Sequence, residues 1–262
     1  MIRESTFLTV YILTVTAVLG AVFGSFINCM AWRIAHGEKI SGGRSHCAVC
    51  GHTLGALDLI PVFSYLFLRG KCRYCGDKIS FRYPATELTL AVAFMLCAWR
   101  FDLTWTALEA MGLACILLGL SLVDLEIYEI PDRFLLTGIL WWAIWTLQSY
   151  LSGEASEGAL IQSLLGGLAL GGGLLILSLI FDKVTGKEGL GGGDIKLFFM
   201  VGLYLGPAVG LFSLIIACFT GILFVILLRQ EKIPFGPAIS LAAFIGLLWG
   251  NSAVDWYLGL FI

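Results

Sequence analysis

Four of the eight cysteines are spaced so that they could bind one metal ion. They form the pairs Cys47-x-x-Cys50 and Cys72-x-x-Cys75, which are separated by 21 residues. Two such pairs at this separation are typical of a structural zinc site with four thiolate ligands. The polar segment around them, residues 33–83, has few apolar residues for a core, so bound zinc would supply folding free energy. The alternative is a pair of disulfides, which a reducing cytosol disfavours.

Two aspartates at the ends of apolar runs could form a catalytic pair. Asp124 ends the run 107–123, and Asp194 follows the three glycines 191–193 just before another run begins. An ionised side chain inside a membrane-spanning segment costs about 2.5–3.5 kcal/mol, so its presence needs a reason. If the two carboxylates meet, one stays protonated beside its charged partner, and such a pair can activate water and protonate a leaving amine. The alternative is that each aspartate caps a helix or is an interfacial charge.

Two charged residues near the aspartates are candidates for supporting roles. Asp132 follows Pro131 and precedes an apolar run, so we expect it to cap the next helix. Lys196 lies two residues after Asp194 and is a candidate for binding an acidic residue of a substrate. The alternative for Lys196 is a positive charge that anchors its helix at the membrane surface.

The composition of the whole chain is that of a polytopic membrane protein. Of its 262 residues, 59% are hydrophobic and 13% are charged, and the mean hydropathy is +0.93. Soluble domains are about 45–50% apolar and about 25% charged, so a soluble globule, a disordered chain and a disulfide-rich mini-protein are excluded. A net charge of −2 gives no overall positive field for nucleic acid, and we expect no nucleic-acid partner.

The apolar runs predict about eight membrane-spanning helices, because about 20 apolar residues cross the hydrocarbon layer. The runs cover residues 7–32, 85–99, 105–123, 134–151, 159–181, 196–206, 208–228 and 236–250. Gly206-Pro207 would turn the chain between two of them. Residues 251–262 are expected to be an interfacial tail anchored by Trp256 and Tyr257. The glycines at 166, 167 and 171–173 indicate a face for close helix packing.

The basic residues predict the orientation of the spans in the membrane. With the N-terminus outside, the inner loops hold Arg33, Lys39, Arg44, Arg69, Lys71, Arg73, Lys78, Arg82, Arg133, Lys183, Lys187, Lys196, Arg229 and Lys232. The outer segments hold only Arg3 and Arg100. We therefore expect both termini outside and the cysteine segment in the cytoplasm, with Asp124 and Asp194 both at the cytoplasmic face.

These observations predict a mainly α-helical, polytopic transmembrane bundle with a small cytoplasmic loop domain that resembles a zinc ribbon. Residues 1–34 would form the first transmembrane helix, and residues 35–84 the four-cysteine loop. Residues 85–262 would form the transmembrane core that contains both aspartates.

Several short blocks, in order along the chain, resemble one known family. They are GSFIN at 24–28, the cysteine pairs, IPVFSY at 60–65, RGKCRYC at 69–75, RYPATE at 82–87, Asp124 followed after six intervening residues by Pro131-Asp132, GGGD at 191–194 and IPFGP at 233–237. Together they resemble the bacterial type IV prepilin peptidases, which are GxGD-type aspartic proteases of pilus and type II secretion systems. The resemblance extends over nearly the whole chain.

The resemblance implies an activity and a set of site residues. The family removes the short basic leader from prepilins and pseudopilins at the cytoplasmic membrane and then N-methylates the new terminus with S-adenosylmethionine. By this resemblance Asp124 and Asp194 are the catalytic aspartates, with water as the nucleophile. Gly70, Lys71 and Glu87 are candidates for binding S-adenosylmethionine, and the cysteine loop is associated with methylation.

Two alternatives remain open at the level of sequence. The chain departs from the family near the cysteine loop, with Ala48 after the first cysteine, Ala35-His36-Gly37 after the first helix and Asp58-Leu59 before Ile60-Pro61. A peptidase without methyltransferase activity is therefore one alternative. The other is a non-enzymatic, zinc-bearing membrane scaffold or transporter, although the chain has no visible repeat of the kind that transporters carry.

Overall fold

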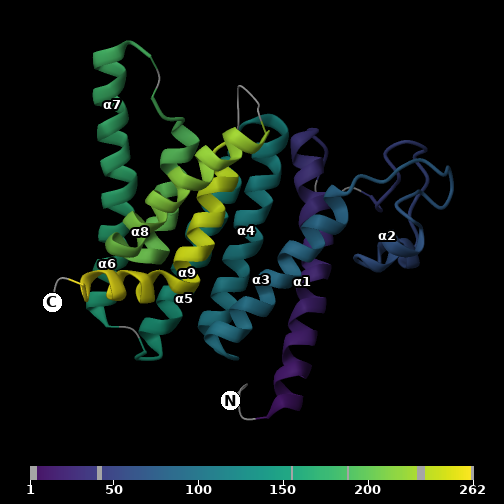
Figure 1. Cartoon of the computed structure of the whole chain (residues 1–262), viewed down its shortest axis with the longest axis horizontal. Helices are drawn as coiled ribbons and strands as arrows, with labels where there is room; N and C mark the ends of the chain where they lie inside the picture. Colours follow the sequence, from purple (N-terminus) through teal and green to yellow (C-terminus); the bar gives the residue numbers. More distant parts are fainter. Residues whose placement is uncertain (1–4, 40–42, 155, 188, 229–233, 261–262) are drawn as a thin grey trace. The chain divides into compact units, whose positions relative to one another are not determined.

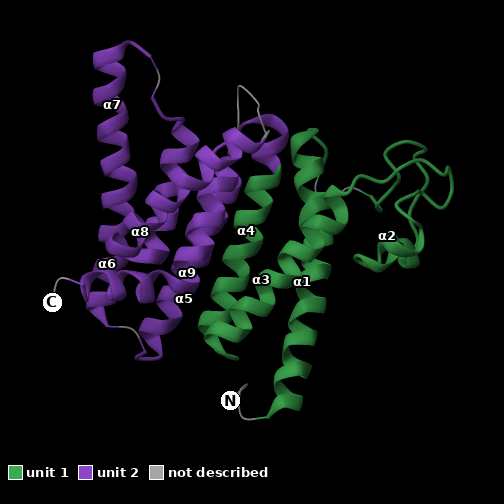
Figure 2. Ribbon diagram, viewed as in Figure 1, with its two compact units in different colours: residues 1–122 green, residues 123–262 purple. Residues whose placement is uncertain are grey.

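The computed structural model describes residues 5–39, 43–154, 156–187, 189–228 and 234–260. Helices dominate these ranges and no strand longer than an isolated bridge occurs in them, which confirms the mainly α-helical fold class. Four residues that the motifs or the charge pattern used lie outside the described residues, namely Arg3, Arg229, Lys232 and Ile233. The chain divides into two compact units, residues 1–122 and 123–262 (Figure 2).

Two long helices that pack along each other form the frame of the first unit. They are α1 (Thr6–Ala35) and α3 (Arg82–Phe101), which lie side by side in Figure 1. Two glycines of α1 allow this contact: a Cβ atom on Gly20 would lie 2.4 Å from the carbonyl oxygen of Leu90, and one on Gly24 would lie 2.7 Å from the Cα atom of Glu87. The helix backbones therefore touch where larger residues would hold them apart.

The cysteine segment joins α1 to α3 and contains little regular structure. Its helical parts are the 3₁₀ turn η2 (Ala56–Leu59) and the short helix α2 (Phe63–Phe67). Isolated antiparallel bridges join His46 to Thr53 and Lys71 to Lys78. The next helix, α4 (Trp105–Ile127), leads into the second unit.

The second unit is built on α8, which packs against most of the other helical elements of the unit. Its elements are α5 (Asp132–Leu151), α6 (Glu157–Gly167), the π-helical turn η3 (Leu168–Gly172), α7 (Gly173–Thr185), α8 (Gly192–Leu228) and α9 (Gly236–Leu258). Both α6 and α9 pack on α8. The unit therefore places the GGGD block and the IPFGP block at the starts of two helices that are in contact.

The predicted turn at Gly206-Pro207 is confirmed, and it makes α8 a hairpin of two helical halves. Gly206 has a non-helical backbone, with φ 70° and ψ 178°. Two pairs of contacts show that the chain then runs back on itself: Phe198 and Gly221 both lie against Phe235. Further along, a Cβ atom on Gly246 would contact both Leu205 and Ser213.

Six helices of the described chain are long and apolar enough to cross a membrane: α1, α4, α5, α6 continued through α7, α8 and α9. The predicted span 85–99 forms α3, which is not one of these six helices. The predicted interfacial tail is helical for most of its length, because α9 continues to Leu258, and residues 261 and 262 lie outside the described residues. The chain is therefore a multi-pass membrane protein.

The predicted glycine face of residues 166–173 is confirmed for its first part. A Cβ atom on Gly166 would lie 2.3 Å from the carbonyl oxygen of Gly202, and one on Gly202 would lie 2.4 Å from that of Gly166. A Cβ atom on Gly171 would lie 2.5 Å from the Phe199 Cβ atom, whereas Gly173 has nothing within 4 Å. Gly166 and Gly202 therefore mark the closest approach of α6 to α8.

This contact predicts a large difference between two alanine substitutions. Gly166→Ala should lower the free energy of unfolding by about 1–3 kcal/mol, because the new methyl group meets backbone rather than a movable side chain. Gly173→Ala, the matched control, should leave stability unchanged or raise it. Thermal unfolding of both variants in detergent would test this, and equal unfolding temperatures would contradict it.

Candidate functional site

The four cysteines of the two pairs converge on one point in the first unit. The sulfur atoms of Cys47, Cys50, Cys72 and Cys75 all lie within 4.8 Å of one another. Four thiolates around one tetrahedral ion with metal–sulfur distances of about 2.3 Å would lie about 3.8 Å apart, which is within this limit. The cluster can therefore hold a metal ion, and none of these cysteines is in a disulfide.

The two pairs have the same backbone geometry, which explains why both present their thiols to one point. The amide of Gly51 donates to the carbonyl of Cys47, and the amide of Gly76 donates to that of Cys72, at 2.9 Å in each case. Both glycines have positive φ, of 69° and 75°, which a glycine adopts without strain. Backbone hydrogen bonds from Tyr74 and Cys75 lower the pKa of Cys72 to about 7, against the opposing effect of burial.

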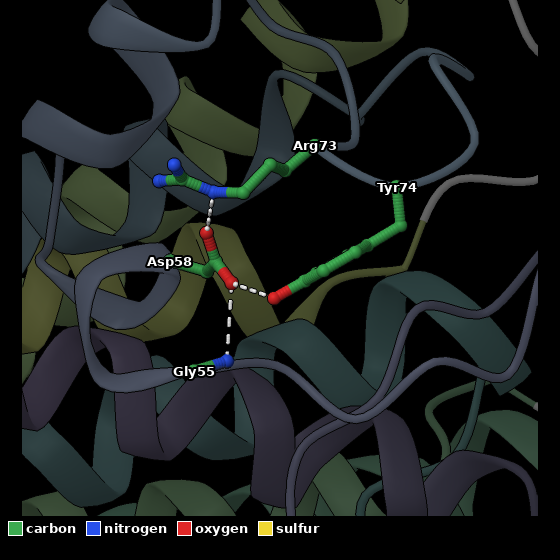
Figure 3. A network of polar contacts seen from close by, with 4 residues as sticks. All are labelled: Gly55, Asp58, Arg73 and Tyr74. Atoms are coloured by element: carbon green, nitrogen blue, oxygen red, sulfur yellow. Dashed lines mark hydrogen bonds and ion pairs between the residues drawn. The ribbon is translucent and has the colours of Figure 1, made fainter.

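A carboxylate outside the cluster joins the two halves of the cysteine loop (Figure 3). Asp58, in η2, accepts hydrogen bonds from the Arg73 Nε at 2.6 Å, the Tyr74 hydroxyl at 3.1 Å and the Gly55 amide at 3.0 Å. Burial disfavours its charge, but these donors outweigh that effect and hold the pKa of Asp58 below its usual range. The Tyr74 ring also lies against the His52 ring at a tilt of 31°, with ring centroids 3.6 Å apart. Asp58 therefore ties the second cysteine pair to the chain that follows the first.

In the second unit, Asp124 lies in a buried position at the end of α4. The residue is 4% exposed, and its Oδ2 atom accepts a hydrogen bond of 2.9 Å from the backbone amide of Gly236, the first residue of α9. Sequence analysis identified Asp124 but assigned no role to Gly236. Every residue except proline has a backbone amide, so the residue type does not reveal which amide will act as a donor. The only signal for Gly236 was its place in the IPFGP block.

Asp194 is half-buried in the first turn of α8. The loop before it is held by a hydrogen bond at Gly189 and by close packing at Gly193. The Gly189 amide donates to the Asp182 carboxylate at 2.7 Å, and a Cβ atom on Gly193 would lie 3.2 Å from the Ile130 Cβ atom. The charge of Asp124 acts on Asp194, so the two predicted aspartates lie near each other within the second unit. Sequence analysis assigned no role to Asp182, whose residue type and spacing carry no recognisable signal.

Lys196 and Asp132 form an ion pair across two helix starts. The Lys196 Nζ atom lies 2.7 Å from the Asp132 Oδ1 atom, and both side chains are largely exposed. The expectation that Asp132 caps α5 is wrong, because Pro131 occupies the cap position and Asp132 is the first helical residue. Its carboxylate instead lies at the surface as the partner of Lys196.

Glu87 holds a strained turn of the cysteine segment. Its Oε2 atom accepts a hydrogen bond of 2.6 Å from the Val62 amide, and the Ser25 hydroxyl also bonds to its carboxylate. Val62 has φ 62° and ψ −51°, and the Phe63 amide donates to the Pro61 carbonyl at 2.6 Å, so Val62 is the centre of a γ-turn. A β-branched residue in this conformation is strained and needs support from its surroundings.

The other two predicted cofactor-binding residues lie in the second half of the cysteine loop. Gly70 has a positive φ of 68°, and a Cβ atom there would lie 3.0 Å from the Tyr65 hydroxyl oxygen, so the turn itself explains the glycine. Lys71 is exposed, and its amide bonds to the Leu68 carbonyl at 3.0 Å. Glu87, Gly70 and Lys71 all belong to the first unit.

The fold and these groups define a polytopic helical membrane protein that combines a four-thiol cluster with a pair of carboxylates at helix ends. Comparison with known proteins places it further. Residues 18–101 match the bacterial Peptidase A24 N-terminal domain, and residues 111–226 match the Type IV leader peptidase family. The chain belongs to this family of type IV leader peptidases.

Curated relatives agree with the family match along most of the chain. A prepilin leader peptidase/N-methyltransferase of Aeromonas hydrophila is 39% identical over 84% of this chain and 76% of its own length. Proteins of the same name from Bacillus subtilis and Pseudomonas aeruginosa are 34% and 33% identical, and the alignments cover more than nine-tenths of each chain. No solved structure matches this chain.

The Asp58 network predicts that metal retention depends on a residue that is not a ligand. Asp58→Ala should release bound metal to a chelator faster and weaken metal affinity by about tenfold, because the cysteine pairs lose their shared support. Asp77→Ala is the matched control, since within the described part of the chain its carboxylate accepts a hydrogen bond from the neighbouring Lys78 amide alone. A chromogenic chelator would follow the release, and identical rates for the two variants would contradict this role.

The Glu87 contact predicts a graded pair of effects on the loop. Glu87→Ala leaves the Val62 amide without its acceptor and should cost about 1–3 kcal/mol of stability. Glu87→Gln keeps an acceptor oxygen and should cost less. Limited proteolysis of the cysteine loop would measure both against Glu129→Ala, an exposed control. Equal digestion rates in the three variants would rule out support of the turn by Glu87.

Proposed function

We propose that this protein is a membrane aspartic endopeptidase that removes the basic leader from type IV prepilins and pilin-like pseudopilins. In this proposal it then methylates the new N-terminal residue with S-adenosylmethionine. The observation that carries the proposal is that Asp124 and Asp194 lie close enough for the charge of one to act on the other. The family membership and the relatives' name, prepilin leader peptidase/N-methyltransferase, support it.

Peptide hydrolysis by this pair would need no covalent intermediate with the enzyme. One carboxylate accepts a proton from water as the water oxygen bonds to the scissile carbonyl carbon, and the other carboxyl gives its proton to the carbonyl oxygen. The carbon–nitrogen bond then breaks as the amine takes the first proton, and a hydroxyl proton returns to the second carboxyl. The pair ends with the single proton that it held at the start.

The proposed orientation fits a substrate whose leader stays in the cytoplasm while its apolar helix lies in the bilayer. The family indicates the bacterial inner membrane. The basic residues favour both termini outside and the aspartates at the cytoplasmic face. Lys196, at the surface two residues after Asp194, would contact an acidic residue of the substrate, with Asp132 holding its ammonium group until then.

The cysteine loop would serve the methylation half of the function. Zinc is the ion that best fits four converging thiolates, and it would stabilise the fold of the loop. We propose that Gly70, Lys71 and Glu87 bind S-adenosylmethionine, which supplies an electrophilic methyl group to the amine of the cleaved substrate. The Val62 turn links Glu87 to the segment that leads to Gly70 and Lys71.

Mass spectrometry of a prepilin incubated with the purified protein and S-adenosylmethionine tests both halves. The expected product lacks its leader and carries one methyl group, and Asp194→Asn should leave the prepilin intact because the carboxylate is gone. A shortened, unmethylated product would mean a peptidase alone. An untouched product with several pilin-like substrates would favour the non-enzymatic scaffold. Cys72→Ser, with cleavage retained and methylation lost, would assign the loop to the second reaction.

A further inference from the structure

The first residue of α9 is placed directly against one of the two aspartates. Gly236 is buried, and its amide donates to the Oδ2 atom of Asp124 across 112 positions of sequence. It begins a helix of 23 residues, so its amide is one of the first four of α9, which have no acceptor within the helix. The positive end of the helix dipole therefore points at the Asp124 carboxylate.

Position 236 has no room for a side chain. A Cβ atom there would lie 2.5 Å from the Asp124 Oδ2 atom and 3.2 Å from its Cγ atom. Because Asp124 is itself buried, its carboxylate could make room only by leaving the amide that it accepts from. The glycine is thus required for the contact, and any larger residue would displace the carboxylate.

Aromatic packing fixes the start of α9 with respect to the helix that carries Asp194. The Phe235 ring lies beside the Phe198 ring, with centroids 6.3 Å apart, and Phe198 follows Asp194 by one helical turn. The Phe235 ring also lies close to Gly221 in the second half of α8, because a Cβ atom there would be 2.8 Å from the ring. Phe235 is held between the two halves of α8, so the Gly236 amide has a fixed place between the helices of both aspartates.

The two carboxylates therefore differ in their surroundings. Asp124 has a backbone donor at hydrogen-bond distance, whereas no donor to the Asp194 carboxylate occurs among the described residues. A carboxylate that accepts a hydrogen bond holds its negative charge at lower cost than one that does not. Of two neighbouring acids that share one proton, the one without the donor keeps the proton more readily.

We propose that Gly236 is a positioning residue that orients Asp124 and keeps it as the charged member of the pair. Asp124 is then the group that takes the proton from the attacking water, and Asp194 is the group that gives its proton to the scissile carbonyl oxygen. This inference rests on the proposed peptidase function and adds a role for each aspartate.

The test compares two alanine substitutions in α9. Gly236→Ala should lower kcat for prepilin cleavage by about a hundredfold, since a reacting group is displaced by about an ångström, and should leave KM nearly unchanged. Gly250→Ala is the matched control: its Cβ atom would crowd the Val209 side chain at 2.2 Å, far along α9 from the aspartates. It should lower the unfolding temperature but retain the wild-type kcat.

A second reaction on the same polypeptide separates a displaced aspartate from a misfolded protein. Methyl transfer to a pilin that already lacks its leader should proceed at the wild-type rate in Gly236→Ala. Wild-type kcat for cleavage in this variant would overturn the role of Gly236, and so would equal losses of kcat in Gly236→Ala and Gly250→Ala. If Asp124→Asn itself retains cleavage, the proposed peptidase site fails instead.

Discussion

Close contact between helix backbones at glycine is the constraint on which the rest of this structure depends. Gly24 brings α1 against the backbone of Glu87, and Gly166 and Gly202 bring α6 against α8. Lipid supplies no hydrophobic force between helices, so dispersion contacts at short distance must hold the bundle. Close approach at glycine also determines which polar groups can form hydrogen bonds. The short side chain of Asp124 reaches the Gly236 amide because position 236 has no side chain in the way.

Carboxylates that accept backbone amides recur at each part of the chain that carries a proposed function. Asp58 accepts from Gly55 in the cysteine loop, Glu87 from Val62 at its entry, and Asp124 from Gly236 in the helical core. Asp182 does the same for Gly189, in the loop before Asp194. A backbone amide has no side-chain torsion angles, and when buried it needs an acceptor. Each of these charge-assisted hydrogen bonds therefore holds the backbone of its segment directly.

The helical fold and the converging cysteines were predictable because both depend on residue type and spacing. Long apolar runs specify helices, and Cys47, Cys50, Cys72 and Cys75 specify their own cluster. The turn at Gly206-Pro207 was equally visible, since glycine and proline together break a helix. The residues that support the site were not predictable in this way. Gly236 acts through its backbone amide and Val62 through an unusual backbone conformation, and the Asp132 side chain forms an ion pair with Lys196 and does not cap α5. Such roles depend on tertiary contact, and one sequence alone holds no signal for them.

The hairpin within α8 has a consequence for how the chain enters its membrane. Its turn, residues 203–210, contains no charged side chain, and both halves of α8 are strongly apolar. The two halves can therefore be inserted together from one side, with only the polar backbone groups of a single bend to be carried through the lipid. No charged side chain of this hairpin then has to cross the membrane during insertion. Asp194 remains on the side of the membrane from which the hairpin entered.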